Sequence, residues 1–304
     1  MLRAETDRST TLGIASSIGA NVMWGLVPLY YQLLTHVPVL QTTTYRVVLS
    51  LPMLALLVWL LPRQAERAAT PKWVSLVCGV LIGINWLLFV YLVVNGRAME
   101  ASLAYFVTPL AIVAVGVVLF GERMDRKQTI AIVLAAAGCV VFALDSLKQL
   151  DRLWPLVIAF LMAAAVAAYT TVRRRHDVPG VEGVFREVVV LTPAALVGLI
   201  WFGMPPVGES GSPGVLLTTL YLAGAAVFTV APLSLFGFAT TRLPMRVLGF
   251  IQYLGPSMQL GCSLALGQKL TPTRLAGFGL IWAALVVFTV ASSTSRRGKS
   301  SEQS

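Results

Sequence analysis

Few side chains of this 304-residue chain could do chemistry, and those that could interrupt long apolar stretches. The most informative of these side chains is Arg46, which lies within the apolar stretch 40–61. At 1.5 Å per residue it is roughly 10 Å from the start of that stretch. If this stretch spans a membrane, a buried guanidinium costs about 2.5–3.5 kcal/mol at the helix centre, so it tends to face a cavity or a partner. Arg46 therefore predicts a binding or gating group, while a purely structural or snorkelling arginine remains the alternative.

Aromatic and amide side chains occupy similar settings. Rings with single hydrogen-bonding groups suit a small amphipathic solute, which needs apolar contact and a few fixed polar groups. Tyr and Trp also populate membrane-interface belts, whereas an amide in the middle of a span must find a partner. The predicted substrate-binding residues are Trp24, Tyr30, Arg46, Asn85, Trp86, Tyr91, Tyr105, Tyr169, Gln252 and Tyr253.

Motifs for catalysis or cofactor binding are missing from the sequence. It contains no G-x-x-x-x-G-K-[ST] loop, no HExxH and no CxxC, so direct ATP drive, a metal site and a cofactor are not expected. We therefore expect a non-enzyme with no catalytic residues. Two alternatives stay open: a membrane enzyme acting on lipid-linked substrates, which would need a cluster of carboxylates or histidines, and a non-transporting scaffold, which would need no polar groups in mid-span.

The elements that must position these residues are membrane-spanning helices. Hydrophobic residues make up 57% of the chain and charged residues 12%, against about 25% charged in soluble domains. A span needs about 20 mostly apolar residues. The sequence predicts an all-α integral membrane protein with ten spans, at 12–33, 40–61, 73–94, 101–120, 128–145, 154–172, 184–203, 215–236, 247–266 and 273–292.

The basic residues indicate the topology. Of the 23 Lys and Arg residues, 17 lie on the side of the N-terminus, 5 lie on the other side, and Arg46 lies within a span. Such an asymmetry over short loops is the positive-inside rule, so we expect a multi-pass protein of the cytoplasmic membrane with both termini cytoplasmic. The net charge of +10 then indicates topology and contact with anionic membrane lipid, and no nucleic-acid partner. The oligomeric state is open, a homodimer included.

The chain also repeats itself. TYRVVLSLP at 44–52 reappears as FREVVVLTP at 185–193, and AYFVTP at 104–109 as IQYLGP at 251–256. With five spans in each half, the second half must run inverted relative to the first, and the substrate pathway of such proteins lies between the halves. The sequence predicts two repeats, at 1–146 (helices 1–5) and 147–293 (helices 6–10), followed by a disordered cytoplasmic tail at 294–304.

The repeat suggests gating pairs. It places Arg46 opposite Glu187, and Glu100 opposite Arg246, at opposite membrane faces. We therefore expect an outer pair of Arg46 with Glu100 and an inner pair of Glu187 with Arg246; gating and static helix-end pairing are equal alternatives.

Two prolines, Pro109 and Pro256, also occupy equivalent positions. Each removes a helical hydrogen bond, so kinks there could shape both walls of one cavity, against the alternative of plain helix packing.

Four segments resemble a known family: WGLVPLYY at 24–31, the run 85–110, LFGER at 119–123 and GFIQYLGPSMQL at 249–260. Together they resemble the RarD branch of the EamA-type transporters in the drug/metabolite transporter superfamily. The resemblance implies a ten-helix, inverted-repeat exporter of the inner membrane, with a central cavity and with the fifth and tenth helices peripheral. Some members are named for chloramphenicol sensitivity or resistance, so tolerance to that drug is an implied trait, although the antibiotic is not carried over as the physiological substrate.

Two positions depart from that family's pattern. Tyr45 precedes Arg46 where the family often has histidine, and Gln268 follows Gly267 where the second repeat often has glutamate, which leaves Glu122 without an equivalent. The prediction is a secondary transporter, most simply an exporter, of small amphipathic or amino-acid-like solutes by alternating access. Proton coupling and facilitated diffusion both remain open, since few titratable groups lie within the spans.

Overall fold

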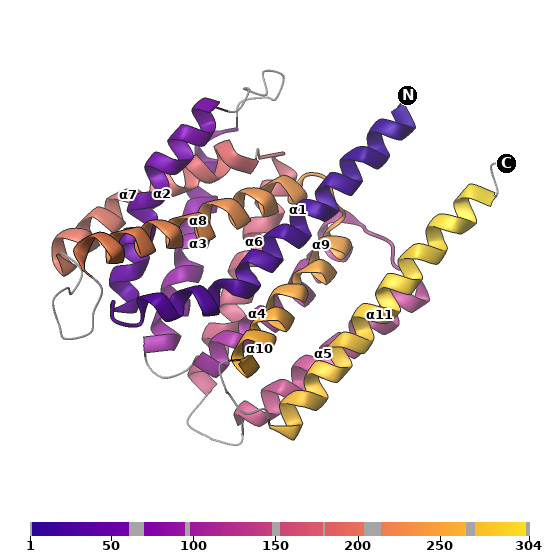
Figure 1. Cartoon of the computed structure of the whole chain (residues 1–304). Coiled ribbons are helices and arrows are strands. Elements are labelled where there is room, and N and C mark those ends of the chain that lie inside the picture. Colours follow the sequence, from indigo (N-terminus) through magenta and orange to yellow (C-terminus); the bar gives the residue numbers. More distant parts are fainter. Residues whose placement is uncertain are drawn as a thin grey trace.

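The chain folds as a bundle of helices (Figure 1). The structure is a computed structural model that describes residues 2–60, 70–94, 98–147, 153–178, 180–203, 214–265 and 271–301, and these residues contain no strand. The helices are α1 (Leu2–Tyr31), the 3₁₀ helix η1 (Gln32–Leu34), α2 (Val39–Leu60), α3 (Lys72–Val94), α4 (Ala98–Phe120), α5 (Arg126–Leu147), α6 (Leu153–Arg175), α7 (Gly180–Phe202), α8 (Val215–Thr240), α9 (Met245–Gln252), α10 (Leu254–Ala265) and α11 (Pro272–Ser301).

Nine of the ten predicted spans correspond to one helix each, and the ninth is broken. It consists of α9 and α10, separated at Tyr253. Pro256 explains the break, because it has no N–H to donate to the carbonyl of Gln252 four residues earlier. The equivalent Pro109 does not interrupt α4. At the C-terminus, α11 continues to Ser301, so the predicted tail is helical as far as that residue.

The outer surface of the bundle is apolar, as a lipid-facing surface must be. Ile200 and Trp201 of α7 are 85% and 83% exposed, an exposure that would favour aggregation in water. Six helices, α1, α2, α3, α6, α7 and α8, contain segments long and apolar enough to cross a membrane. Shorter apolar segments lie at Ala104–Phe120 and Leu275–Phe288. The fold is thus that of an all-α integral membrane protein.

The packing of helices follows a twofold pattern. Equivalent helices of the two halves pack against each other, α2 with α7, the pieces of the ninth span with α4, and α5 with α11. Several other contacts also come in equivalent pairs, such as α1 with α8 and α6 with α3, or α2 with α8 and α7 with α3, whereas the packing of α4 on α5 has no equally extensive counterpart between the ninth span and α11. Two five-helix repeats related by a twofold axis produce such a pattern.

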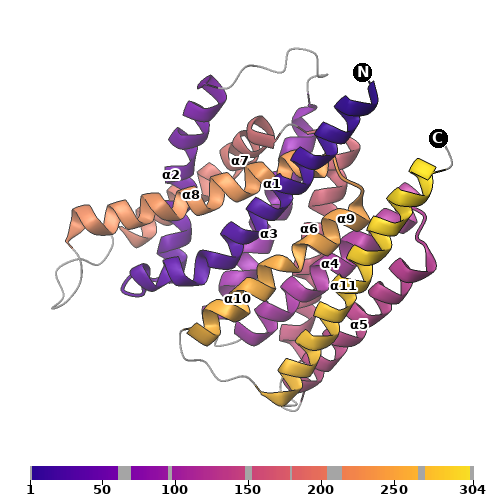
Figure 2. The same cartoon turned by 45° about the vertical axis from the view of Figure 1, so that its right-hand side comes forward.

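The α5 and α11 helices form a separate pair at the edge of the molecule (Figures 1 and 2). Aromatic rings join this pair to the rest of the bundle, with Phe106 of α4 edge-on to Phe278 and Phe250 of α9 stacked on Phe288. Edge-on and stacked pairs stabilise by about 0.5–1.5 kcal/mol each beyond the area they bury. The pair therefore supports the bundle from outside, and the remaining helices form its centre.

Candidate functional site

Arg46 of α2 contacts the end of α1 and a ring of α3. It comes two turns after the start of α2, and its Nη1 donates a hydrogen bond to the hydroxyl of Tyr31 at the end of α1 (2.9 Å). Its guanidinium carbon lies 4.7 Å from the centre of the Trp86 ring of α3. Tyr105 of α4 is within electrostatic reach of both Arg46 and Tyr31. We call Tyr31, Arg46, Trp86 and Tyr105 the Arg46 site.

The guanidinium of this site is only partly satisfied. Its Nε is buried and makes no hydrogen bond with any described residue. Among the described residues, no carboxylate lies within ion-pair distance of it. The side chain of Glu100, its predicted partner, lies outside the described residues, so that pair stays a prediction. Arg46 is thus a cation in an apolar helix, stacked on a ring, with a hydrogen-bonding edge left over.

The other predicted binding residues are divided among several places. Trp24 packs on Phe236 of α8 with ring centres 5.5 Å apart, and the hydroxyl of Tyr30 donates to the carbonyl of Tyr221 (2.6 Å), so both join α1 to α8. Asn85 is buried and donates to the carbonyl of Met162 on α6 (3.2 Å). These three side chains already have structural partners.

The remaining predicted residues lie elsewhere. Tyr91 is 48% exposed on α3. Gln252, at the helix break, is buried with its amide oxygen unpaired among the described residues, and Tyr253 packs beside Phe250 in the core next to α5 and α11. Of the ten predicted residues, Arg46 and Trp86 are in direct contact, and Tyr105 lies near them on α4, where its ring packs 5.8 Å from that of Phe89. The structure adds Tyr31, which sequence reasoning passed over in favour of its neighbour Tyr30.

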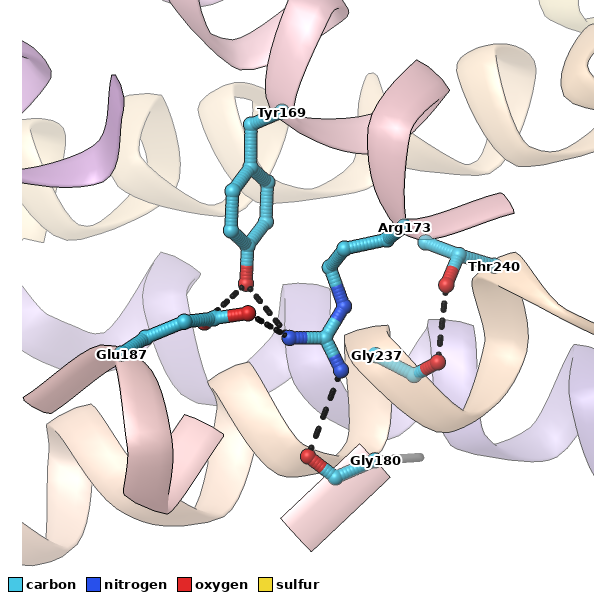
Figure 3. Close-up of polar contacts among 6 residues, drawn as sticks. All are labelled: Tyr169, Arg173, Gly180, Glu187, Gly237 and Thr240. Carbon is cyan, nitrogen blue, oxygen red and sulfur yellow. Dashed lines mark hydrogen bonds and ion pairs between the residues drawn. The ribbon is translucent and has the colours of Figure 1, made fainter. Parts of the chain in front are cut away.

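A second polar group is fully buried between α6 and α7 (Figure 3). Arg173 forms an ion pair with Glu187, and these side chains are 0% and 1% exposed. Tyr169 connects them, because its hydroxyl accepts from Arg173 (3.1 Å) and donates to Glu187 (2.9 Å). We call these three residues the Arg173 network. The positive charge of Arg173 and the negative charge of Glu187 cancel within the network.

Small residues make room for this network. A Cβ at Gly237 of α8 would lie 2.4 Å from a terminal nitrogen of Arg173, and one at Gly183 of α7 would lie 3.1 Å from the same atom. That nitrogen donates to the carbonyl of Gly180 (3.4 Å). The guanidinium is therefore held on all sides by α6, α7 and α8.

The predicted pair of Glu187 with Arg246 is wrong. Glu187 is taken by Arg173, one turn beyond Tyr169 on the same face of α6. Sequence reasoning ended that span at residue 172 and assigned the whole run Arg173–Arg175 to a solvated loop. Instead Arg173 is buried and Arg175 is exposed. The spacing of Tyr169 and Arg173, four residues apart, was the signal that could have found the network.

Arg246 and Glu122 form a different contact, at the start of α9. The carboxylate of Glu122, just after α4, accepts from the backbone N–H of Met245 (2.7 Å) and of Arg246 (3.0 Å). It also pairs with Arg174 at the end of α6 (3.3 Å). A carboxylate at a helix N-terminus satisfies unpaired N–H groups and complements the helix dipole. Glu122 therefore connects the first repeat to the second. We call this end of the bundle, where α4 and α6 end and α9 begins, the basic end.

The opposite end, where α7 ends and α2 begins, is held by neutral groups; we call it the distal end. Gln41 and Tyr45 of α2 donate to the carbonyl of Gly203, at 3.2 and 3.0 Å. His36 hydrogen-bonds to Thr218 of α8 (3.2 Å). Among the described residues, both ends thus carry contacts between the repeats, with an ion pair at the basic end and hydrogen bonds of Gln41, Tyr45 and His36 at the distal end.

Comparison with known proteins agrees with this architecture. The sequence model of the EamA-like transporter family matches residues 11–144. Protein RarD of Streptomyces exfoliatus is 33% identical over 294 residues, covering 95% of this chain and 90% of that protein. An uncharacterized transporter of Vibrio cholerae is 34% identical over 300 residues, covering 95% and 96%.

A solved crystal structure also shares the fold. It is 20% identical and superposes with a TM-score of 0.66, covering 94% of this chain and 98% of the other. Fold, repeat and relatives agree along nearly the whole chain. The chain therefore belongs to the RarD branch of the EamA-like transporter family, whose members are multi-pass membrane transporters.

Proposed function

We propose that this transporter is a secondary carrier that exports small amphipathic or amino-acid-like solutes across the cytoplasmic membrane by alternating access. The observation that carries the proposal is the Arg46 site. A partly satisfied cation of α2 that contacts an aromatic ring of α3 and the end of α1 is expensive as a structural element and useful as a binding group.

The aromatic residues of the site support an amphipathic solute. Trp86 and Tyr105 offer ring faces, and Tyr31 and Arg46 offer hydrogen-bonding groups. Ligand sites combine such apolar walls with a few fixed polar groups.

The contacts between the repeats support alternating access. At the distal end the side chains of α2 bond to the end of α7, and at the basic end Glu122 bonds to the start of α9. In each case a side chain of the first repeat holds backbone of the second, so either set can break and reform while both repeats stay folded. The distribution of Lys and Arg supports a cytoplasmic basic end. Arg46 and Glu100 both belong to the first repeat, so their predicted pair would not hold one repeat against the other.

Solute counterflow into proteoliposomes tests the proposal. Purified protein is reconstituted, and a panel of radiolabelled amino acids and small aromatic acids and amides is screened with and without a pH gradient. We expect saturable counterflow of at least one solute, abolished or strongly reduced in Arg46→Gln. Arg175→Gln is the matched control, because Arg175 is exposed at the end of α6 and should leave flux unchanged. If no solute exchanges, the carrier proposal fails.

A further inference from the structure

The two repeats treat one equivalent position differently. The repeat offset of 141 residues places Arg46 on Glu187. Each contacts a residue near the end of the preceding helix, Arg46 with Tyr31 of α1 and Glu187 with Arg173 of α6, although the same offset places Arg173 on Gln32 and not on Tyr31. In the second repeat a cation meets an anion. In the first repeat a cation meets a neutral phenol, so the anion is missing from the pair.

We propose that the carboxylate of the transported solute supplies this missing anion at Arg46. The inference rests on the proposed carrier function and names the class of solute: a small monocarboxylate with an aromatic or apolar body. The bound solute would complete the first-repeat pair as Arg173 completes the second.

The hydrogen-bonding groups of the site suit a carboxylate. Nη1 of Arg46 is used by Tyr31, and Nε is buried without a described partner. The Nε and Nη2 groups of an arginine lie on one edge of its plane and donate two parallel bonds to the two oxygens of a carboxylate. The hydroxyl of Tyr31 accepts from Arg46, so its own proton remains to be donated toward the same anion.

The charge of the site distinguishes a carboxylate from other groups. A monocarboxylate neutralises the single cation, whereas a phosphate dianion would leave a surplus negative charge in an apolar surrounding. A neutral amide would leave the cation unpaired. The rings of Trp86 and Tyr105 then contact the body of the solute, which favours aromatic or apolar side groups.

Matched probes test this inference on the full chain in detergent and in proteoliposomes. The probes are 3-phenylpropanoate, its amide 3-phenylpropanamide, and phenyl phosphate, and binding is measured by calorimetry and exchange by counterflow. We expect 3-phenylpropanoate to bind about 10- to 100-fold more tightly than the amide, since a charged hydrogen-bonding pair is lost in the amide. Phenyl phosphate should bind more weakly than 3-phenylpropanoate at pH 8, where it is a dianion.

Variants separate the role of the cation from a folding defect. Arg46→Gln should remove the preference for the carboxylate and leave amide binding unchanged. Arg46→Lys should keep part of that preference, because lysine has the positive charge but cannot donate two parallel hydrogen bonds to a carboxylate. Tyr31→Phe keeps Arg46 and should weaken the carboxylate alone by a few-fold. The inference is overturned if the amide binds as tightly as the carboxylate, or if Arg46→Gln weakens both equally. If none of the three probes and no other solute binds or exchanges, the proposed carrier function itself fails.

Discussion

The Arg46 site and the Arg173 network are built around equivalent positions of the two repeats, Arg46 and Glu187, and show opposite properties. The Arg173 network is fully buried, and its cation is paired with the carboxylate of Glu187 and with the hydroxyl of Tyr169. Both of its helices belong to the second repeat, so in the proposed alternating-access cycle it would move with that repeat as one body. The Arg46 site is partly exposed, and its cation lacks an anion among the described residues. Glu187 therefore has a structural role in the second repeat, whereas the equivalent Arg46 has the properties of a binding residue.

At the basic end, Glu122 replaces the predicted pair of Glu187 with Arg246 as the expected gating contact. A pair within one repeat cannot report on the movement of one repeat against the other. Glu122 can, because it connects the end of α4 to the start of α9. The charged contact that opens and closes is therefore expected at Glu122, while Glu187 stays paired throughout the cycle.

Breaking the Arg173 network should have the largest effect on stability. Glu187→Ala leaves Arg173 buried and unpaired, and we expect a loss of about 3–5 kcal/mol in the free energy of unfolding. Thermal unfolding in detergent would measure it. Replacing both partners, Arg173→Met with Glu187→Leu, should recover most of the loss, because no buried charge remains. A stable Glu187→Ala protein would show that the network is not the scaffold described here.

Crowding the network should have the next largest effect. Gly237→Ala places a methyl group against the guanidinium of Arg173, and we expect a loss of about 1–3 kcal/mol. Gly279→Ala on α11 meets nothing within 4 Å and should instead be neutral or stabilise by up to about 1 kcal/mol. Equal melting temperatures for the two variants would contradict the close packing of α8 on Arg173.

Removing the contact between repeats at the basic end should have a smaller effect on stability and a distinct effect on transport. Glu122→Ala loses the cap of α9, which costs about 0.5–2 kcal/mol. If the contact breaks in every cycle, the maximal rate of counterflow should change while half-saturation stays constant. Arg175→Gln, at an exposed position of the same end, should change neither. A change in half-saturation alone would place Glu122 in solute binding instead of gating.

The neutral contacts of the distal end should matter least for stability. Tyr45→Phe removes one hydrogen bond to the carbonyl of Gly203, and we expect a loss of about 0.5 kcal/mol. Thermal unfolding beside Glu187→Ala gives the comparison directly. A loss as large as that of Glu187→Ala would mean that the two ends are held equally strongly.

The sequence was sufficient for the spans and the repeat, because apolar length and the recurrence at 141 residues are local signals. It also singled out Arg46, since a charge in an apolar run is conspicuous, and the binding role of Arg46 stays a prediction. The sequence was insufficient to identify the groups that the charged side chains contact. Arg173 was lost at a span end drawn one residue too early, and the carboxylate of Glu122 meets backbone N–H groups that no sequence pattern displays. Which face of a helix an aromatic residue occupies depends on packing, so Tyr30 and Tyr253 were predicted for a pocket and lie in helix contacts.

The most direct measurement is counterflow of 3-phenylpropanoate by Tyr31→Glu, with Tyr31→Gln as its matched control. Glutamate at this position would give Arg46 the internal anion that Glu187 gives Arg173, and so would convert the site into a second charge-complete pair. The account predicts that Tyr31→Glu folds with undiminished stability and loses carboxylate exchange, while Tyr31→Gln retains it. Carboxylate exchange in Tyr31→Glu at the rate of the unaltered protein would contradict the account.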